Sequence, residues 1–347
     1  MDPKVNGART EEEITKNWKY SEPPLVSIRC TTYNHEPYIR DAIEGFLMQE
    51  TDFPFEVVIH DDASTDGTAD IIREYEERYP NLIKPIYQVE NQYSKEGKPT
   101  TRILNKKMRG EFVAVCEGDD YWTDPGKLQI QIDAMRKYPE CDICFHSATM
   151  KYQDKSRPDK IFGRPRKESG IIPLGEVIRG GGEFMPTASI VLKKDILENL
   201  PEWYYTTAPI GDLFWQIYGS KRGGALFIDR NMAVYRAMAP GSWSTRVKRR
   251  DYKIDVQMKR LKCLELQKED LYIEYYRDVD YLIALQKLEM AIINLQGLAF
   301  NSYKSFIEES WKAFPRLNRR QILLYQFRKC PCVPYSYSKM LQYFKFI

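Results

Sequence analysis

The sequence contains no apolar run long enough to cross a membrane. Its most hydrophobic stretch, residues 281–300, is interrupted by five polar or charged side chains, whereas a spanning helix needs about 20 mainly apolar residues. We therefore expect this stretch to form a buried amphipathic helix. The first 20 residues lack the apolar segment of a secretory signal, which favours a cytoplasmic location.

Cysteine and histidine are also scarce, with seven and three residues among 347. An odd number of scattered cysteines indicates free thiols in a reducing compartment. Cys141 and Cys144 have metal-ligand spacing, but Cys330 and Cys332 are too close together to complete a zinc site with them. The few histidines and the absence of a Gly-x-Ser-x-Gly motif argue against a histidine-based or serine hydrolase.

Positive and negative charges are nearly balanced: the sequence has 52 Lys and Arg and 49 Asp and Glu, which gives a net charge of +3. So small a surplus argues against a dedicated nucleic-acid-binding protein. The 43% of hydrophobic and 29% of charged residues are typical of a globular protein, and the length allows about two domains. No Gly-x-Gly-x-x-Gly follows the first expected strand, which excludes a dinucleotide-binding dehydrogenase.

Apolar segments alternate with helical patterns over the first 120 residues. Strands are expected at residues 25–30, 55–59, 82–87 and 112–116, with helices at 37–49 and 66–79. This alternation predicts an α/β fold with a mostly parallel sheet flanked by helices. Further along, we expect a helix at 127–137, strands at 142–150, 188–192 and 225–228, and a mobile loop at 151–169.

These patterns divide the chain into three parts. Residues 1–23 are polar and predict a loose N-terminal arm, residues 24–245 form the α/β domain, and residues 246–347 are mainly helical. The helical part has three interpretations: an acceptor-binding element, a homodimer contact, or a membrane-surface element. The basic and aromatic residues of its tail, such as Arg319 and Phe327, suit an anionic lipid surface, and an ordinary basic surface explains them equally well.

Acidic residues gather where two of the expected strands end. Asp61 and Asp62 follow the second strand, and Glu117, Asp119 and Asp120 follow the fourth. The carboxyl ends of parallel strands meet at one edge of a sheet, where ligands bind. So many carboxylates in one crevice are costly unless a divalent cation lies among them. The simpler interpretation, a pair of solvated turns, does not explain a double aspartate at the end of a buried strand.

Three motifs in this region resemble those of a known family. Residues 26–34 read Val-Ser-Ile-Arg-Cys-Thr-Thr-Tyr-Asn, residues 60–68 read His-Asp-Asp-Ala-Ser-Thr-Asp-Gly-Thr, and residues 118–120 read Gly-Asp-Asp. They resemble, in order and spacing, the nucleotide-binding half of family 2 glycosyltransferases, over about residues 24–245. The resemblance implies the Rossmann-like GT-A fold and inverting transfer of a sugar from a nucleotide-diphosphate donor, usually a UDP-sugar, with Mn²⁺ or Mg²⁺ assisting.

The resemblance also implies a role for each matched residue. Thr31 and Tyr33 would contact the nucleoside, with Tyr33 stacking near the base. Asp62 would accept a hydrogen bond from uracil N3, and Asp119 would lie near the ribose. Asp120 would bind the metal ion that bridges to the diphosphate oxygens, where it neutralises the leaving group.

The segment Ile210-Gly211-Asp212 resembles the family's Glu-Asp motif, which supplies the catalytic base. Inverting transfer needs a carboxylate that takes the proton of the attacking acceptor hydroxyl, and Asp212 occupies that position. Gly211 stands where the family commonly has a glutamate, so the match is partial. The alternative interpretation of Asp212 is an N-cap of the helix that follows.

Other matches are weaker. Arg102 lies where relatives place a basic residue near the donor, and a surface salt bridge explains it almost as well. Tyr235-Arg236 resembles a strand after which many relatives have a metal-binding histidine, but Ala237 follows here. Either Arg236 or the basic run Arg246, Lys248, Arg249 and Arg250 is interpreted as a counter-charge for the diphosphate, and a solvated basic face is the alternative for that run. His35 is interpreted as a cap of the first expected helix.

Two functions are carried forward. The first is a glycosyltransferase of polysaccharide or cell-envelope synthesis that acts on a glycan or lipid-linked acceptor, with peripheral attachment at the inner membrane face as a hypothesis. The alternative is a non-catalytic protein that binds a sugar nucleotide, or serves as a scaffold, and keeps the GT-A fold. Loss of turnover in an Asp120→Ala variant distinguishes them.

Overall fold

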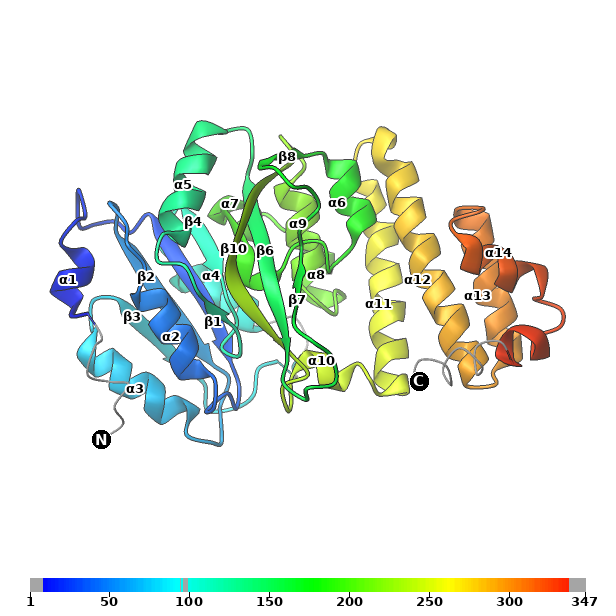
Figure 1. The fold of residues 1–347 in the computed structure, drawn as a ribbon, viewed down its shortest axis with the longest axis horizontal. Coiled ribbons are helices and arrows are strands. Elements are labelled where there is room, and N and C mark those ends of the chain that lie inside the picture. Colours follow the sequence, from blue (N-terminus) through cyan, green and yellow to red (C-terminus); the bar gives the residue numbers. More distant parts are fainter. Residues whose placement is uncertain (1–8, 94, 96–98, 337–347) are drawn as a thin grey trace. The chain divides into compact units, whose positions relative to one another are not determined.

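The computed structural model describes residues 9–93, 95 and 99–336 (Figure 1). The chain divides into two compact units. The first contains the residues up to Thr206 together with Gly211–Thr245, and the second contains Thr207–Ile210 together with the residues from Arg246 onward. Each unit has its own buried core, and each is described by itself.

The first unit is built on a ten-stranded sheet with the order β3-β2-β1-β4-β9-β6-β10-β5. Its other two strands lie outside this order: β7 pairs with β6, and β8 pairs with β10. Strands β1 (Val26–Thr32), β2 (Phe55–Asp61), β3 (Ile83–Tyr87) and β4 (Phe112–Val115) are parallel. Their order places β1 between β2 and β4, so their carboxyl ends form one edge. The α/β fold predicted from the sequence is therefore confirmed.

The other half of the sheet is mixed. Strand β9 (Val191–Lys193) runs antiparallel between β4 and β6 (Ile143–Tyr152), and β6 is parallel to β10 (Ala225–Ala237). The short strands are β5 (Tyr121–Trp122), β7 (Lys160–Phe162) and β8 (Gly170–Ile172). Two expectations are corrected here. The segment 151–169 contains β7, and the strand expected at 225–228 continues to Ala237 because β6 pairs along its whole length.

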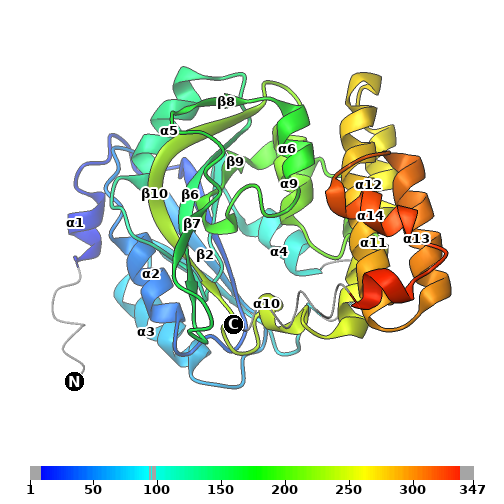
Figure 2. The same cartoon turned by 45° about the vertical axis from the view of Figure 1, so that its right-hand side comes forward.

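Helices cover both faces of this sheet (Figure 2). Those on one side are α2 (Ile39–Leu47), α3 (Thr68–Arg78) and α5 (Lys127–Lys137), and their apolar residues share a core with Val26, Ile28 and Cys30 of β1. The remaining helices are α4 (Pro99–Lys107), α6 (Leu174–Gly180), α7 (Lys194–Glu198), α8 (Glu202–Thr206), α9 (Asp212–Gly219) and the 3₁₀ turn η2 (Thr187–Ser189). The helix α10 (Trp243–Arg246) follows β10.

The segment expected to be a loose N-terminal arm includes a packed helix, α1 (Glu11–Thr15). Thr10 and Glu13 form a capping box at its start. Ile14 is 2% exposed and belongs to the sheet core, and the indole Nε1 of Trp18 donates to Thr51 Oγ1 at 3.1 Å. The described part of this segment is therefore held by the domain.

The second unit is helical, as predicted. Its helices are α11 (Arg250–Glu269), the 3₁₀ turn η3 (Ile273–Tyr275), α12 (Tyr276–Gln296), α13 (Phe300–Ala313) and α14 (Arg319–Gln326). Its buried core contains Leu288, Ala291, Leu295, Tyr303, Ile307 and Leu324. The stretch 281–300 is α12 up to Gln296, followed by a turn in which Leu298 has φ +60°. Within the described residues, no helix is both long and apolar enough to span a bilayer.

Candidate active site

An acidic turn follows β4 and carries three carboxylates. Asp120 is 1% exposed, and its Oδ1 accepts the backbone N–H of Arg236 at 2.8 Å. Burial raises the pKa of Asp120 well above its usual range, and the neighbouring Asp119 and Glu117 raise it further. The side chain of Asp119 is 15% exposed and is the more accessible of the two aspartates. The turn therefore concentrates negative charge that the protein itself only partly compensates.

Arg236 of β10 is the cation that holds this turn. Besides the bond of its backbone N–H to Asp120, its guanidinium Nη1 donates to the carbonyl oxygen of Asp119 at 2.9 Å, and its Nη2 pairs with Asp41 of α2. The guanidinium also lies 4.3 Å from the centre of the Tyr121 ring. The sequence suggested Arg236 as a counter-charge for diphosphate, whereas the structure uses it to fix the backbone of the acidic turn.

A buried tryptophan fixes the other end of the turn. Trp122 is 2% exposed, its Nε1 donates to Ala188 O at 2.8 Å, and its ring meets Phe46 of α2 edge-on at 4.9 Å. Because β5 pairs with β10 next to it, the acidic turn is anchored at both ends. These contacts fix the backbone that directly follows Asp119 and Asp120.

Glu117, the first carboxylate of the acidic turn, interacts with two residues of β1, Thr31 and Arg29. Thr31 Oγ1 donates to Glu117 Oε2, and Nη1 of Arg29 lies 3.7 Å from Glu117 Oε1. Burial raises the pKa of Glu117, with Asp119 and Asp212 adding to the effect. Arg29 is 4% exposed, and within the described part of the chain its Nε and Nη1 donate no hydrogen bond. Thr31, matched to the nucleoside contact, is thus oriented by Glu117, which the sequence-based assignment did not include.

His35 is a further residue whose position the sequence did not reveal. The helix α2 has Tyr38 as its N-cap and no side-chain cap, so the prediction that His35 caps it is wrong; the carbonyl oxygen of His35 accepts from Tyr38 and Ile39 in the preceding turn. The imidazole Nε2 lies 4.0 Å from Asp119 Oδ2, and the buried Nδ1 has no hydrogen-bond partner among the residues described. Burial lowers the pKa of His35. The strand-end position of the Thr-Tyr-Asn-His segment was the signal that could have pointed to it.

Asp62 and Tyr33 lie at the ends of β2 and β1. Asp62 is 5% exposed, and its two carboxylate oxygens accept the N–H groups of Gln92 at 2.7 Å and Tyr93 at 2.9 Å. It therefore anchors the segment after β3 in this structure. The Tyr33 side chain is 44% exposed at the same edge, which makes its ring accessible for stacking.

Asp212 is the first residue of α9, and Gly211 is the N-cap. The expected alternative, Asp212 as the cap, is therefore not what the backbone shows. Its Oδ1 accepts the N–H of Leu213 at 2.7 Å, and its Oδ2 accepts from Thr187 Oγ1 at 3.3 Å. Its charge raises the pKa of both Glu117 and Tyr235, as do the charges of the acidic turn. Thr187, which donates to Asp212, precedes Ala188, whose carbonyl oxygen accepts from Trp122 at the end of the acidic turn. The fold thus links Asp212 to the acidic turn through η2, although 92 residues separate Asp120 and Asp212 in sequence.

A glycine at position 211 has a packing reason. A Cβ there would lie 2.5 Å from the hydroxyl of Tyr204 and 2.9 Å from the Trp215 ring. Tyr204 is fully buried, so a larger side chain at 211 would displace a core residue. The glutamate common in the family has no room in this packing.

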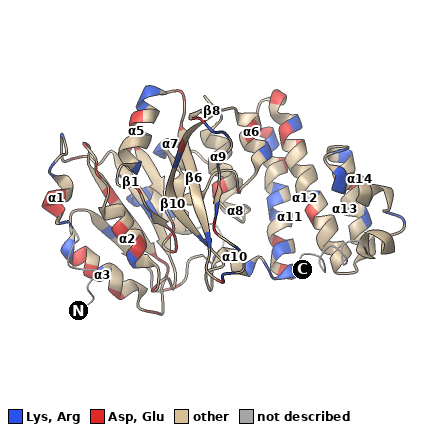
Figure 3. Cartoon of the chain, in the orientation of Figure 1, with Lys and Arg blue, Asp and Glu red and all other residues tan. Residues whose placement is uncertain are grey.

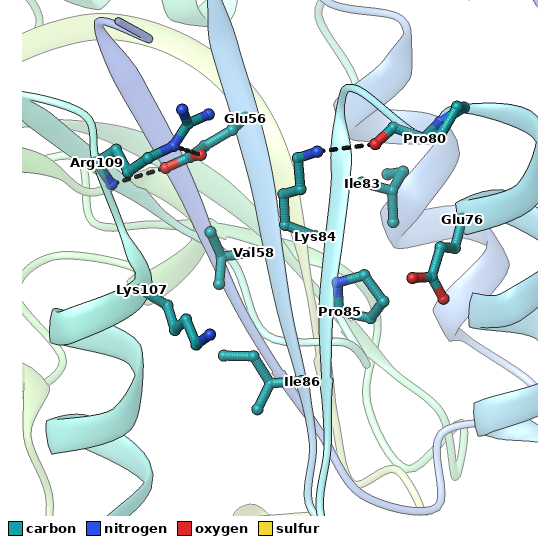
Figure 4. Close-up of a pocket in the computed structure, with 10 residues that line it drawn as sticks. All are labelled: Glu56, Val58, Glu76, Pro80, Ile83, Lys84, Pro85, Ile86, Lys107 and Arg109. Atoms are coloured by element: carbon teal, nitrogen blue, oxygen red, sulfur yellow. Dashed lines mark hydrogen bonds and ion pairs between the residues drawn. The ribbon is translucent and has the colours of Figure 1, made fainter.

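Arg102 forms a salt bridge, as in the alternative interpretation given from the sequence. Its guanidinium pairs with Glu202 at 2.8 Å and lies 4.0 Å from the centre of the Tyr205 ring. Nearby, a separate pocket lies between the start of β2, strand β3 and the end of α4 (Figure 4). Glu56 pairs there with Arg109 at 2.8 Å. This pocket is at the opposite ends of the strands from the acidic turn.

The donor set of the acidic turn fits a hard divalent cation, because carboxylate oxygens are the ligands that Mg²⁺ and Mn²⁺ prefer. Within the described residues, no three His, Cys, Asp or Glu side chains are grouped to hold a metal by themselves. Such ions commonly use one or two carboxylates, with the other positions filled by substrate phosphates and water. Asp119 and Asp120 provide that number.

Comparison with solved structures identifies the fold. The S. aureus TarS 1–349 structure in complex with UDP superposes with a TM-score of 0.55 at 19% identity, covering 89% of this chain and 88% of that one. The first unit, with its curled mixed sheet and acidic strand ends, therefore has the GT-A fold.

Sequence comparison gives the family. Residues 27–198 match the model of glycosyl transferase family 2, and this region of the chain belongs to that family, as the motifs predicted. The uncharacterized protein Rv1520 of Mycobacterium tuberculosis is 35% identical over 63% of this chain and 60% of its own length. The putative teichuronic acid biosynthesis glycosyltransferase TuaG of Bacillus subtilis is 34% identical over 43% of this chain and 55% of its length. The chain thus spans about 60% of the first of these relatives.

Proposed function

We propose that the protein is an inverting glycosyltransferase that moves a sugar from a nucleotide-diphosphate donor, a UDP-sugar, to a hydroxyl of a glycan or lipid-linked acceptor. The observation that carries the proposal is that Asp212 and the acidic turn are held by the same short segment: Thr187 donates to Asp212, and Trp122, which follows the turn, donates to the carbonyl oxygen of the adjacent Ala188. The family match and the glycosyltransferase names of relatives support the reaction class. The likeness of fold to TarS solved with UDP supports the choice of nucleotide.

In this proposal the first half of the sheet binds the donor. Tyr33 offers an exposed ring for the base, and Thr31 lies beside it with its hydroxyl oriented by Glu117. The acidic turn would hold Mn²⁺ or Mg²⁺ through Asp120 and its neighbour Asp119, and the bound ion supplies charge neutralisation for the leaving diphosphate. Asp120 Oδ1 already accepts from Arg236, which leaves Oδ2 as its oxygen for a cation.

Asp212 acts as the base. As the acceptor oxygen attacks C1 of the sugar, its proton passes to the Asp212 carboxylate and the nucleoside diphosphate leaves from the opposite face. The hydrogen bonds from Leu213 and Thr187 fix the orientation of that carboxylate before the acceptor arrives. This arrangement requires no covalent intermediate, in agreement with inversion.

The donor site is tested by calorimetric titration with UDP, with and without Mn²⁺. We expect Mn²⁺-dependent binding that Asp120→Asn reduces by at least about tenfold, because the charge facing the cation is lost. Asp133→Asn, at an exposed position of α5, removes the same charge and serves as control. Absence of UDP binding with any metal would refute the uridine donor.

The base is tested separately by an Asp212→Asn variant. We expect UDP-sugar binding to persist while turnover falls by about 10² to 10⁴, because the amide accepts no proton from the acceptor. Turnover by this variant at the wild-type rate would exclude Asp212 as the base. UDP-sugar binding by the wild type with no turnover toward any acceptor would favour the non-catalytic alternative.

A further inference from the structure

The segment after β6 carries an unusual charge. Residues 151–169 contain seven Lys or Arg and three Asp or Glu, a net charge of +4, while the rest of the chain has 45 basic and 46 acidic residues. The whole positive surplus of the protein therefore lies in 19 residues. The end of β6 is blue in Figure 3, where the hairpin to β7 begins.

Four cations of this hairpin point to a ligand outside the chain. Lys151, Lys155, Arg157 and Lys160 are exposed, and none of them forms an ion pair with another described residue. By contrast, Arg164 pairs with Asp229. The four residues are called the basic hairpin below. Three of them, Lys151, Lys155 and Arg157, line a hollow of about 360 Å³ that Tyr152, Gln153, Pro158 and Asp159 also line. Arg157 lies 5.8 Å from the Tyr152 ring.

The basic hairpin is joined directly to the candidate active site. Phe162 of β7 contacts Tyr235 of β10 with ring centres 5.7 Å apart, and the pKa of Tyr235 is raised by burial and by the charges of Asp120, Asp119 and Asp212. In the sheet, Lys151 is the register partner of Arg236. The hairpin thus extends the strand pair that holds the acidic turn.

The basic hairpin lies on other strands than those proposed to bind the nucleotide. The nucleotide would lie at the ends of β1, β2 and β4, whereas β6 and β10 come after β9 in the strand order. The four cations therefore lie on the side from which an acceptor would approach Asp212. An acceptor with negative groups would meet repulsion from the carboxylates of the acidic turn, and cations beside its path offset that repulsion and raise its association rate.

We propose that the basic hairpin is the docking surface for a polyanionic acceptor, a glycan or polyol polymer with phosphate or carboxylate groups along its chain. This inference rests on the proposed transferase function and names the acceptor class. A polymer matches four cations spread along one hairpin better than a single small anion does. A lipid surface fits less well, because Ile161 is the one large apolar side chain exposed in the described residues of this hairpin.

The test compares two variants of the full-length chain. In the first, Lys151, Lys155, Arg157 and Lys160 are all replaced by Ser. In the control, the exposed residues Lys16, Lys106, Lys107 and Lys137 are replaced by Ser, which removes the same charge elsewhere. Binding is measured with sodium polyphosphate, polygalacturonate, neutral dextran, and vesicles of phosphatidylglycerol and phosphatidylcholine, between 50 and 300 mM NaCl.

We expect the wild type to bind at least one of the two polyanions and not dextran. The hairpin variant should bind that polyanion about tenfold or more weakly and with less salt dependence, because exposed ion pairs are screened by salt, while the control stays within about twofold. The better of the two polyanions distinguishes phosphate from carboxylate recognition.

Three results would overturn the inference: no polyanion binding by the wild type, equal losses in both variants, or a loss confined to the lipid vesicles. Circular dichroism and the UDP titration, run on the same samples, report folding and the donor site. A wild type that binds UDP but no polyanion refutes the acceptor class alone, whereas one that does not bind UDP refutes the donor proposal instead.

Discussion

A single buried lysine lies close to the acidic turn without belonging to it. Lys127, the first residue of α5, is fully buried, its Nζ donates no hydrogen bond to any residue that the structure describes, and it lies 4.0 Å from the centre of the Trp122 ring. Burial lowers the pKa of Lys127 to about 7. The amine is therefore a source of instability that the surrounding core has to offset.

This gives a pH-dependent prediction for Lys127→Met. The unfolded chain binds a proton on this lysine between pH 7 and 10.5 that the folded chain does not, so the free energy of unfolding of the wild type rises with pH in that window. The Lys127→Met variant lacks this pH-dependent contribution to the free energy of unfolding. We expect it to be more stable by about 1–4 kcal/mol near pH 6.5, with the gain shrinking toward pH 9.

Urea unfolding at both pH values measures this gain. Lys137→Met, at the exposed end of the same helix, is the control and should change stability little at either pH. A gain from Lys127→Met that is the same at pH 6.5 and pH 9 would contradict the assignment of the lowered pKa.

The close packing around Gly211 predicts that a side chain at this position lowers stability. We expect Gly211→Ala to cost about 1–3 kcal/mol of stability, because its Cβ would lie 2.5 Å from the Tyr204 hydroxyl. Combining it with Tyr204→Phe removes the hydroxyl and should recover part of the loss. Thermal unfolding of the two single variants and the double variant gives the coupling, and strictly additive losses would show that the two positions do not clash.

Among the elements, the two-residue strand β5 has an effect beyond its length. Through Trp122 it links the acidic turn to the carbonyl of Ala188 in η2, and through its pairing it links the turn to β10. The position of the acidic turn therefore depends on a segment that follows it by more than 60 residues. A change at Trp122 should reach the site through the orientation of the turn.

We expect Trp122→Phe to lower the free energy of unfolding by about 1–3 kcal/mol, since the Ala188 carbonyl loses its buried partner, and also to weaken Mn²⁺-dependent UDP binding. Trp18→Phe is the matched control, because it removes the bond of Trp18 Nε1 to Thr51 far from the turn in sequence. It should reduce stability but leave UDP affinity unchanged. Equal UDP affinities for wild type and Trp122→Phe would show that the turn does not need this anchor.

Strand β3 lies at the edge of the sheet, and its sequence disfavours pairing with a strand of another molecule. Its outer edge carries Pro85, which is the register partner of Ile59 on the inner side. Proline has no N–H to offer a further strand, so it discourages edge-to-edge association. The edge of the sheet formed by β3 thereby resists pairing with a further strand.

For the whole molecule, the division into two units with separate cores has a measurable consequence. Ile307 is fully buried in the core of the second unit, beside Tyr303 and Leu324. We expect Ile307→Ala to cost about 2–5 kcal/mol and to increase hydrogen exchange in α12, α13 and α14. Amides of β1 and β2 should keep their protection.

The control is Ile28→Ala in β1, which is fully buried in the other core and should have the reverse pattern. Hydrogen exchange with mass spectrometry reports both patterns. Loss of protection throughout the chain in either variant would mean that the two units unfold as one.

Much of the first unit could be predicted from local sequence. The strands β1 to β4, the helices between them and the acidic residues at two strand ends follow from apolar runs, helix periodicity and turn residues close to one another in the chain. The helical character of the second unit follows in the same way. The short helices α6 to α8 and the strand β7 could not be predicted, because segments of three to seven residues carry too few periodic positions.

The candidate site was predictable only in part. The motifs indicated Asp62, the acidic turn and Asp212, but not what each side chain contacts. Arg236 contacts Asp41, 195 residues away, and Glu117 orients Thr31, 86 residues away. Such contacts depend on how strands are ordered in the sheet, which local sequence does not encode.

The sequence by itself determined the alternation of strands and helices, the placement of carboxylates at strand ends and the excess of positive charge in residues 151–169, because each is a property of neighbours along the chain. The tertiary structure decided that Asp120 is buried against Arg236, that His35 lies against Asp119, and that Gly211 has no room for a side chain. It also placed the basic hairpin beside the acidic turn. These are outcomes of packing between distant segments, where burial changes both the space and the electrostatic cost available to each group.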